Sequence, residues 1–217
     1  MAIDQKSRQK KLARKTKKRK KAISSKKMNV SFGEQLSRKK ALIVAQNSPV
    51  HNCFIGKDIF TEGIGTAIIS REMPNNYLGI GVFLLDVWCL GVKNTYFSVL
   101  SEKEYNDRLE EIRMNEILEN IHPSCARKLI EQCVDYSKEL GFKPHKNYKI
   151  SRQLFMSIDP AACPNKYHFG KDGKPFYISG PNENVNHSMR IINTLSQNCG
   201  EGNFDYISSI SENIEID

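Results

Sequence analysis

The sequence has no apolar segment long enough to cross a membrane. Its longest apolar run, residues 78–92, has 15 residues and contains Asp86, whereas a membrane-spanning helix needs about 20 apolar residues. The N-terminus is basic, but the apolar segment that a secretory signal requires does not follow it. We therefore expect a cytoplasmic protein without a membrane partner.

The sequence also lacks a CxxC pair, which excludes the usual spacing of zinc knuckles and redox motifs. Thiols in a protein that is not exported stay reduced, so we expect all six cysteines to be structural thiols rather than metal ligands. Cys125 and Cys133 lie eight residues apart in one predicted helix, where both should pack as small hydrophobic side chains. The cysteines occupy positions 53, 89, 125, 133, 163 and 199.

Acidic side chains are almost missing from residues 1–27, which we call the basic arm. The arm holds 13 Lys and Arg residues against one acid, Asp4, whereas the other 190 residues, which we call the body, hold 20 basic and 23 acidic residues. The net charge of +9 therefore divides into +12 on the arm and −3 on the body. Such a separation is typical of an appended electrostatic tether, not of a basic face spread over a folded domain.

The basic arm has almost nothing to bury and contains no aromatic residue. It cannot offset the entropy of ordering, so we expect it to be disordered on its own, and stacking on unpaired bases is not its mode of binding. Dense Lys and Arg side chains bind polyanions by releasing counterions from phosphates, without reading sequence. The arm thus predicts a nucleic-acid partner, RNA more than DNA, or the ribosome. The contacting side chains would be Lys10, Lys11, Arg14, Lys15, Lys17, Lys18, Arg19, Lys20 and Lys21.

Other functions of the arm stay open. It could be a solubilising tail, it could bind an acidic protein or anionic lipid, or it could be a nuclear import signal if the source is eukaryotic. The preferred hypothesis is a non-enzymatic protein that the arm anchors on nucleic acid or the ribosome. The body would then contact a protein partner or add weak specificity, and no cofactor is expected.

Residues 28–207 are expected to form a single α+β domain with a small central sheet, and residues 208–217 a frayed acidic tail. Apolar runs predict the strands, and the turn signal Pro74-Asn75-Asn76 separates two of them. The run 78–92 is apolar on both alternating faces, so we expect one long, buried, central strand. The predicted strands are 50–55, 64–71, 78–92, 96–99 and 204–207.

Capping and turn signals predict the helices and one hairpin. Ser101 and Glu104 have the spacing of a capping box, and Pro123 suits a first helical position. Asp172-Gly173 is a two-residue turn signal, so residues 166–179 are predicted to form a β-hairpin. The helix expected after 180–182 could hold an anion at its free N–H groups. The predicted helices are about 31–45 (after a second capping box, Ser31 with Glu34), 101–120, 123–140 (closed by Gly141), 147–157 and 183–198 (capped by Gly200).

Asp86 is the most distinctive polar residue of the body, because it lies in the strand that should be buried. A buried carboxylate must be paired, hydrogen-bonded or protonated. Nucleases of the RNase H type place a metal-binding Asp on such a strand, so the alternative hypothesis is a metal-dependent nuclease or phosphoryl-processing enzyme using Asp86 with Asp159 and Asp172. We prefer the simpler interpretation that a backbone or Lys partner at a sheet end satisfies Asp86, because no second acid stands at a fixed local spacing.

Four segments of the body carry a resemblance to a known family. They are FLLDVWCLGVKN (83–94), ARKLIEQCVDYSKELGFKPH (126–145), IDPAAC (158–163) and FGKDGKPFYISGP (169–181). Together with the basic arm, they resemble an uncharacterised family of small bacterial proteins over most of residues 50–207. The resemblance implies an intact domain of bacterial, cytoplasmic origin. It implies no catalytic activity, cofactor or partner, and it carries no functional residue across.

Overall fold

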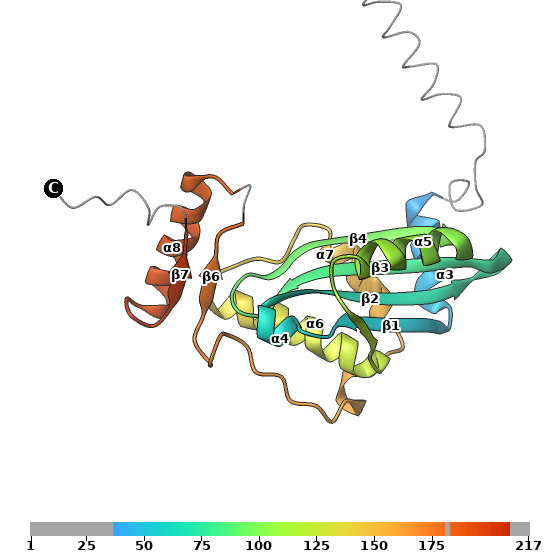
Figure 1. Ribbon diagram of the computed structural model, residues 1–217. Helices are drawn as coiled ribbons and strands as arrows, with labels where there is room; N and C mark the ends of the chain where they lie inside the picture. Colours follow the sequence, from blue (N-terminus) through green and yellow to red (C-terminus); the bar gives the residue numbers. More distant parts are fainter. Residues whose placement is uncertain (1–36, 181–182, 209–217) are drawn as a thin grey trace, which may run out of the picture. The chain divides into compact units, whose positions relative to one another are not determined.

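A computed structural model describes residues 37–180 and 183–208. The predictions for the basic arm, for the capping box at Ser31 and Glu34, and for the tail beyond Ser208 lie outside the described residues. From Arg38 onward the chain forms one compact unit. In that unit, helices and an antiparallel sheet confirm the α+β class (Figure 1).

A five-stranded antiparallel sheet organises this unit. Its strands lie in the order β4-β3-β2-β1-β5, so the first four form a meander and β5 pairs with the outer edge of β1. The strands predicted over 50–55 and 64–71 are confirmed. The bounds are β1 (Val50–Gly56), β2 (Ile64–Met73), β3 (Tyr77–Asp86), β4 (Gly91–Ser101) and β5 (Leu118–Asn120).

The prediction of one strand over 78–92 is wrong, because the chain reverses within it. Strand β3 ends at Asp86 and β4 begins at Gly91, and residues 87–90 form the turn between them. Gly91 has a φ of 70°, and a Cβ there would meet Ser137 Oγ of helix α6 (Pro123–Glu139) at 2.3 Å. The close approach of this turn to α6 therefore requires glycine at position 91.

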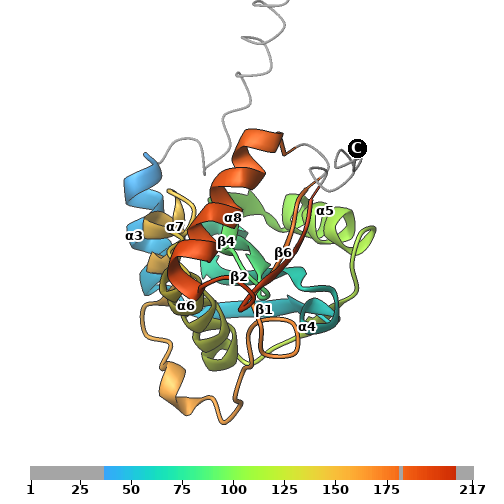
Figure 2. The ribbon, with the colours of Figure 1, turned by 90° about the vertical axis from the view of Figure 1, so that its left-hand side faces the viewer.

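Helices cover both faces of the sheet (Figure 2). Helix α5 (Glu102–Arg113) lies on one face, where its Tyr105 and Leu109 belong to the same buried cluster as Ile80 and Val82 of β3. Helix α6 lies on the other face, where Phe83, the next residue of β3, packs against Tyr148 and Phe155. Strand β3 is thus covered on both sides, as its apolar pattern predicted. The remaining elements of the second face are α3 (Arg38–Asn47), α7 (Tyr148–Ser151) and the 3₁₀ helix η3 (Arg152–Phe155).

Several boundaries follow the local signals. Asn75 and Asn76 adopt φ values of 61° and 58° in the hairpin turn between β2 and β3, which confirms that turn. Ser101 and Glu104 form the predicted capping box at the start of α5. Pro123 is the first residue of α6, which ends just before Gly141. None of the described helices is both long and apolar enough to cross a bilayer.

Two predictions fail where pairing over long sequence distances overrides the local signal. The helix predicted to reach residue 120 ends at Arg113, because β1 recruits Leu118–Asn120 as an edge strand. The hairpin predicted over 166–179 is reduced to one bridge between Lys171 and Lys174 around the Asp172-Gly173 turn. Its second arm, β6 (Phe176–Ile178), instead pairs in parallel with β7 (Asp205–Ile207).

Helices near the C-terminus follow the prediction more closely. Helix α8 (Val185–Cys199) is followed by Gly200 at a φ of 82°, as expected for a glycine cap. Its buried Ile191 and Leu195 pack with Cys89 of the β3–β4 turn and with Tyr177 of β6. The segment predicted as a helix over 147–157 is shorter and is divided into α7 and η3.

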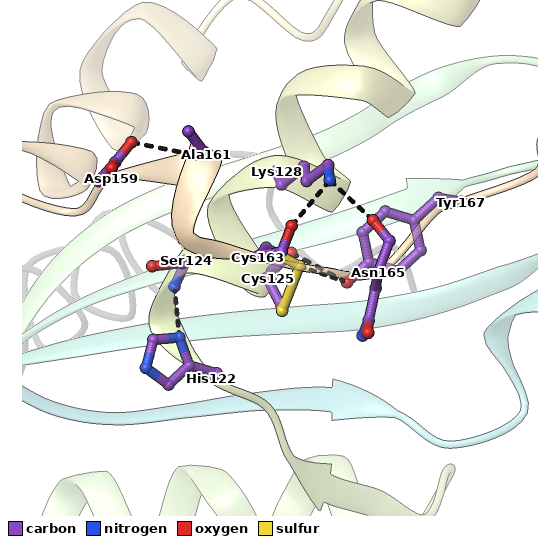
Figure 3. Close-up of a disulfide and its surroundings, with 9 residues drawn as sticks. All are labelled: His122, Ser124, Cys125, Lys128, Asp159, Ala161, Cys163, Asn165 and Tyr167. Atoms are coloured by element: carbon purple, nitrogen blue, oxygen red, sulfur yellow. Dashed lines mark hydrogen bonds between the residues drawn. A yellow bond between two sulfur atoms is a disulfide. The ribbon is translucent and has the colours of Figure 1, made fainter.

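The expectation that all six cysteines are free thiols is wrong, because Cys125 and Cys163 form a disulfide (Figure 3). Their Cα atoms lie 4.9 Å apart, which is within the range that a disulfide can bridge. Cys125 lies in the first turn of α6, and Cys163 directly follows the short 3₁₀ helix η4 (Pro160–Ala162). The two residues are 38 positions apart, so no local spacing signals the pair. Cys133 is a buried free thiol, as expected.

Arg71 of β2 is a buried cation that holds three parts of the chain together. Its side chain is 1% exposed. The guanidinium donates to the carbonyl oxygens of Ser48 at 2.6 Å, Leu154 at 2.8 Å and Met156. Burial lowers the pKa of Arg71, and these acceptors compensate for the water that the charge has lost. The end of α3, strand β2 and the segment after η3 are thereby fixed to one another.

Replacing this cation tests its role. We expect Arg71→Met to lower the free energy of unfolding by about 3–5 kcal/mol, because it leaves several buried carbonyl groups without donors. Urea denaturation followed by circular dichroism measures the change. The control is Arg108→Ala, which removes an exposed ion pair with Glu111 and should cost less than about 1 kcal/mol. Equal losses in the two variants would contradict the role given to Arg71.

Candidate functional site

The structure places Asp86 at the end of β3, where it stabilises the turn that follows. Its Oδ1 atom accepts hydrogen bonds from the backbone N–H groups of Trp88 at 3.2 Å and Cys89 at 2.8 Å. Burial raises the pKa of Asp86, and the Cys89 N–H and the Lys93 ammonium offset this only in part. This geometry agrees with the preferred interpretation, in which backbone groups at the end of the sheet satisfy the carboxylate.

The other two candidate carboxylates lie in separate local structures. Asp159 accepts the N–H of Ala161 at 2.9 Å and caps η4. Asp172 has a φ of 53° in the turn between Lys171 and Lys174. Within residues 37–180 and 183–208, no group of three or more His, Cys, Asp or Glu side chains is arranged to hold a metal ion. The geometry thus adds no support to the nuclease hypothesis.

All nine basic side chains predicted to contact nucleic acid, from Lys10 to Lys21, lie outside the described residues. Among the cavities that the described residues line, one of about 340 Å³ contains several basic side chains, and its size is at the lower end of the range for small-molecule pockets. We call it the basic pocket. It lies between the start of β4, the loop after α6 and the first turn of α8. Its lining residues are Leu90, Val92, Lys93, Phe142, Lys143, His145, Glu183, His187 and Ile191.

A β-bulge directs Lys93 to the basic pocket. Leu84 pairs with Asn94 and Leu85 pairs with Val92, so Lys93 is an extra residue on β4. Such a bulge bends the strand and changes the direction of the side chain that it carries. The Lys93 ammonium lies 3.4 Å from Glu183 Oε1. The bulge thus places the Lys93 ammonium at a fixed position in the pocket.

Glu183 is held from the other side by buried hydroxyl groups. Tyr177 donates its O–H to Glu183 Oε2 at 2.5 Å and forms a second hydrogen bond with Ser188 Oγ at 3.0 Å. Both Tyr177 and Ser188 are fully buried. Burial acts to raise the pKa of Glu183. The Tyr177 hydrogen bond and the Lys93 charge together outweigh that effect, so the pKa lies below the usual 4.5. Glu183 is therefore an ionised carboxylate whose charge Lys93 already balances.

The remaining polar side chains of the basic pocket are one lysine, Lys143, and two histidines, His145 and His187. Lys143, His145 and His187 form no ion pair with any other described residue. The ring of His145 is oriented by its Nδ1 atom, which accepts the N–H of Asn147 at 3.3 Å. With Glu183 already paired to Lys93, the pocket presents the Lys143 ammonium and the two imidazole rings beside an apolar lining. This arrangement suits a phosphate group attached to a small apolar or aromatic unit.

A second cationic feature lies at the β3–β4 turn. Lys171 Nζ is 5.3 Å from the ring centroid of Trp88 and 4.7 Å from that of Phe176. The two rings lie 5.6 Å apart, and the Trp88 indole N–H donates to the Phe60 carbonyl at 3.1 Å. Cation–π attraction therefore places an exposed lysine over a fixed aromatic pair.

Sequence reasoning found only one part of the basic pocket, the start of α8. The bulge at Lys93 leaves no trace in the apolar pattern, because a single extra residue does not interrupt the run of strand-forming residues. The neighbourhood of Glu183 and Tyr177 depends on the pairing of β6 with β7, which was not predicted. Lys143 and His145 lie in segment 126–145, which carries part of the family resemblance. No pattern within that segment indicates which residues they face.

Comparisons with known proteins give no relative for this chain: no protein-family model, no curated protein and no solved structure matches it. Any function must therefore be argued from the residues of the chain itself.

Two substitutions at Asp86 separate its hydrogen bonds from its charge. Asp86→Asn keeps an oxygen that can accept the Trp88 and Cys89 N–H groups, so we expect stability at neutral pH equal to or above that of the wild type. Asp86→Ala removes the acceptor and should cost about 1–3 kcal/mol. Urea denaturation of both variants measures these differences.

The pH dependence gives a further check on the same variants. Because burial raises the pKa of Asp86 above its usual 3.8, the folded state binds more protons than the unfolded state in the window above that value. The wild type should therefore lose stability relative to Asp86→Asn as the pH rises from about 4 towards 7. A wild-type advantage that grows with pH would show that the negative charge itself stabilises the fold, contrary to this account.

Proposed function

We propose that the protein is a non-enzymatic RNA-binding protein that its basic arm anchors on the phosphate backbone. The observation that carries the proposal is the concentration of 13 Lys and Arg residues against one acid in residues 1–27. At this density each bound phosphate releases a condensed counterion, which supplies affinity for any nucleic acid.

The charge of the body supports different roles for the basic arm and the body. With a net charge of −3, the body does not attract a polyanion by its overall field, so any contact that it makes must be local. Lys143 forms no ion pair among the described residues, so the basic pocket is one place where a phosphate group meets uncompensated positive charge.

The shape of the basic pocket favours a flexible strand over a duplex. A duplex presents a regular backbone with its bases stacked inside, whereas a single strand or loop can turn a phosphate and an unstacked base into a concave site. The pocket combines cationic groups with Phe142, Leu90 and Ile191, and this combination supports RNA as the partner more than duplex DNA. The ribosome belongs to the same class, because its surface is largely RNA.

The local roles of the carboxylates support binding rather than catalysis. Asp86 and Asp159 both accept backbone N–H groups at the ends of secondary-structure elements, which is a sufficient structural reason for their presence. The body then serves as a folded module that adds local contacts or holds a protein partner.

Removing the basic arm tests the main part of the proposal. We expect deletion of residues 1–27 to abolish most of the affinity for a single-stranded RNA, measured by fluorescence anisotropy over a range of salt concentrations. For the intact chain, about six phosphate contacts would give a log–log salt slope of about −4 on a single strand and about −5 on duplex DNA. The deleted chain should keep a slope no steeper than about −1, which is the share expected from the basic pocket.

Two arm variants serve as matched controls. Exchanging all nine predicted contact residues for Gln leaves four cations in the arm and should remove most of the affinity. A scrambled arm of the natural composition should bind as tightly as the natural one, because counterion release does not depend on sequence. Unchanged affinity after the deletion would contradict the proposal. Loss of binding with the scrambled arm would show that the arm reads its target specifically.

A single lysine tests whether the basic pocket takes part. In the intact chain, Lys143→Ala should weaken RNA binding several-fold and reduce the magnitude of the salt slope by about 1. The control is Lys103→Ala on α5, which removes an exposed lysine away from the pocket lining. If the two variants weaken binding equally, only the net charge of the body matters and the pocket makes no specific contact.

A further inference from the structure

The disulfide between Cys125 and Cys163 differs in its chemical setting from the three buried free thiols, Cys53, Cys89 and Cys133. Burial raises the pKa of the Cys53 thiol to about 12, and it also raises the pKa of the Cys89 and Cys133 thiols. Those three side chains therefore remain protonated and poorly reactive, because the thiolate is the nucleophile. The bonded pair instead lies where a loop meets the start of a helix (Figure 3).

A cavity leads to one of the two sulfur-bearing residues. It has a volume of about 300 Å³, and Cys125 is part of its lining whereas Cys163 is not. The stacked rings of Phe60 and Tyr167, with centroids 5.8 Å apart, contribute to its wall. Lys57 and Asn165 add polar groups. A small thiol compound entering this cavity would therefore approach Cys125, even though the residue is only 5% exposed overall.

Hydrogen bonds to backbone carbonyl groups also hold the segments that carry Cys125 and Cys163 next to each other. Lys128 of α6 donates to the carbonyl oxygens of Cys163 at 2.9 Å and Asn165 at 2.7 Å. Tyr167 donates its O–H to the carbonyl of Cys125 at 3.3 Å. Arg127 donates to the carbonyl of Ile158 at 2.6 Å. Because these contacts flank Cys163 on both sides, the loop stays beside α6 when the disulfide opens.

Each sulfur has a nearby positive charge or dipole for its thiolate form. Cys125 is the third residue of α6, a helix of 17 residues, and the positive end of a helix dipole stabilises a thiolate in the first turn. The ammonium of Lys128 donates to the backbone carbonyl of Cys163, so a positive charge is fixed on the backbone of the residue that carries the second sulfur. Thiolates that are stabilised in this way are good leaving groups in exchange reactions.

We propose that Cys125 and Cys163 form a reversible thiol–disulfide exchange site whose reaction partner is a low-molecular-weight thiol. The thiolate of the partner attacks Cys125 Sγ through the cavity. The Cys125–Cys163 bond breaks, its electron pair leaves on Cys163 Sγ beside Lys128, and a mixed disulfide forms on Cys125. The site is independent of RNA binding and stands on its own geometry.

The second step completes the reaction. Another thiolate of the partner attacks the outer sulfur of the mixed disulfide, and Cys125 leaves as a thiolate at the start of α6. Overall, two partner thiols are oxidised to one partner disulfide, the protein disulfide is reduced to two thiols, and the two protons pass from the partner thiols to the protein. The reverse sequence closes the protein disulfide again at the expense of the partner's disulfide.

The intact protein can be tested in buffers that contain reduced and oxidised glutathione in varied ratios. After equilibration, free thiols are alkylated without denaturant and located by peptide mass spectrometry, while circular dichroism records the fold. We expect Cys125 and Cys163 to change together between the bonded and alkylated forms in the folded protein, reversibly, while Cys53, Cys89 and Cys133 stay unmodified. If millimolar glutathione opens the bond only after denaturant is added, or if oxidised glutathione never closes it, the proposal is overturned.

Two single variants test the direction of attack. In Cys163→Ser, the remaining Cys125 should form a mixed disulfide with oxidised glutathione, visible as a mass increase of one glutathione. In Cys125→Ser, the remaining Cys163 does not line the cavity and should react about tenfold more slowly. Equal rates in the two variants would overturn the assignment of Cys125 as the entry point, and circular dichroism confirms that both variants keep the fold before their rates are compared.

Discussion

The buried guanidinium of Arg71 is the interaction on which the arrangement of this fold depends. It has no carboxylate partner among the described residues, so carbonyl oxygens from the ends of α3 and η3 must meet its donors. A buried charge tolerates little displacement of its acceptors, because each lost hydrogen bond leaves both groups without water. The position of Leu154 relative to β2 is therefore set by electrostatics, and apolar packing of Phe155 on Phe83 completes it.

Hydrogen bonds from cationic side chains to carbonyl oxygens also hold the irregular segment that follows η3. Arg127 donates to the carbonyl oxygens of Phe155 and Ile158, and Lys128 donates to those of Cys163 and Asn165. Cationic side chains thus replace the backbone partners that a helix or sheet would supply, which is how a segment with little regular structure stays ordered. This segment ends at the disulfide and the stacked ring of Tyr167, so the geometry at Cys125 depends on cations of β2 and α6.

Local signals predicted those elements whose ends are set by neighbouring residues. The Asn75-Asn76 turn, the capping box at Ser101 and the helix from Pro123 all belong to this group. The β3–β4 turn was missed because none of residues 87–90 is a usual turn former, and Asp86 satisfies the turn's N–H groups from the preceding strand. The disulfide and the basic pocket were missed for a different reason. Both bring together residues far apart in sequence, through pairings such as β6 with β7 that no short window contains.

The distribution of cations explains why an arm would be needed at all. Arg71, Arg127 and Lys128 are committed to internal carbonyl groups, and the exposed helices pair several others with acids. What remains for a polyanion is the set of cations without an internal partner, among them Lys143 of the basic pocket, on a body whose net charge is negative. Such a body cannot gain affinity by long-range attraction, since its field repels phosphates. Under the proposed function, an appended basic segment would supply the attraction without disturbing the internal pairs, and the body would contribute geometry.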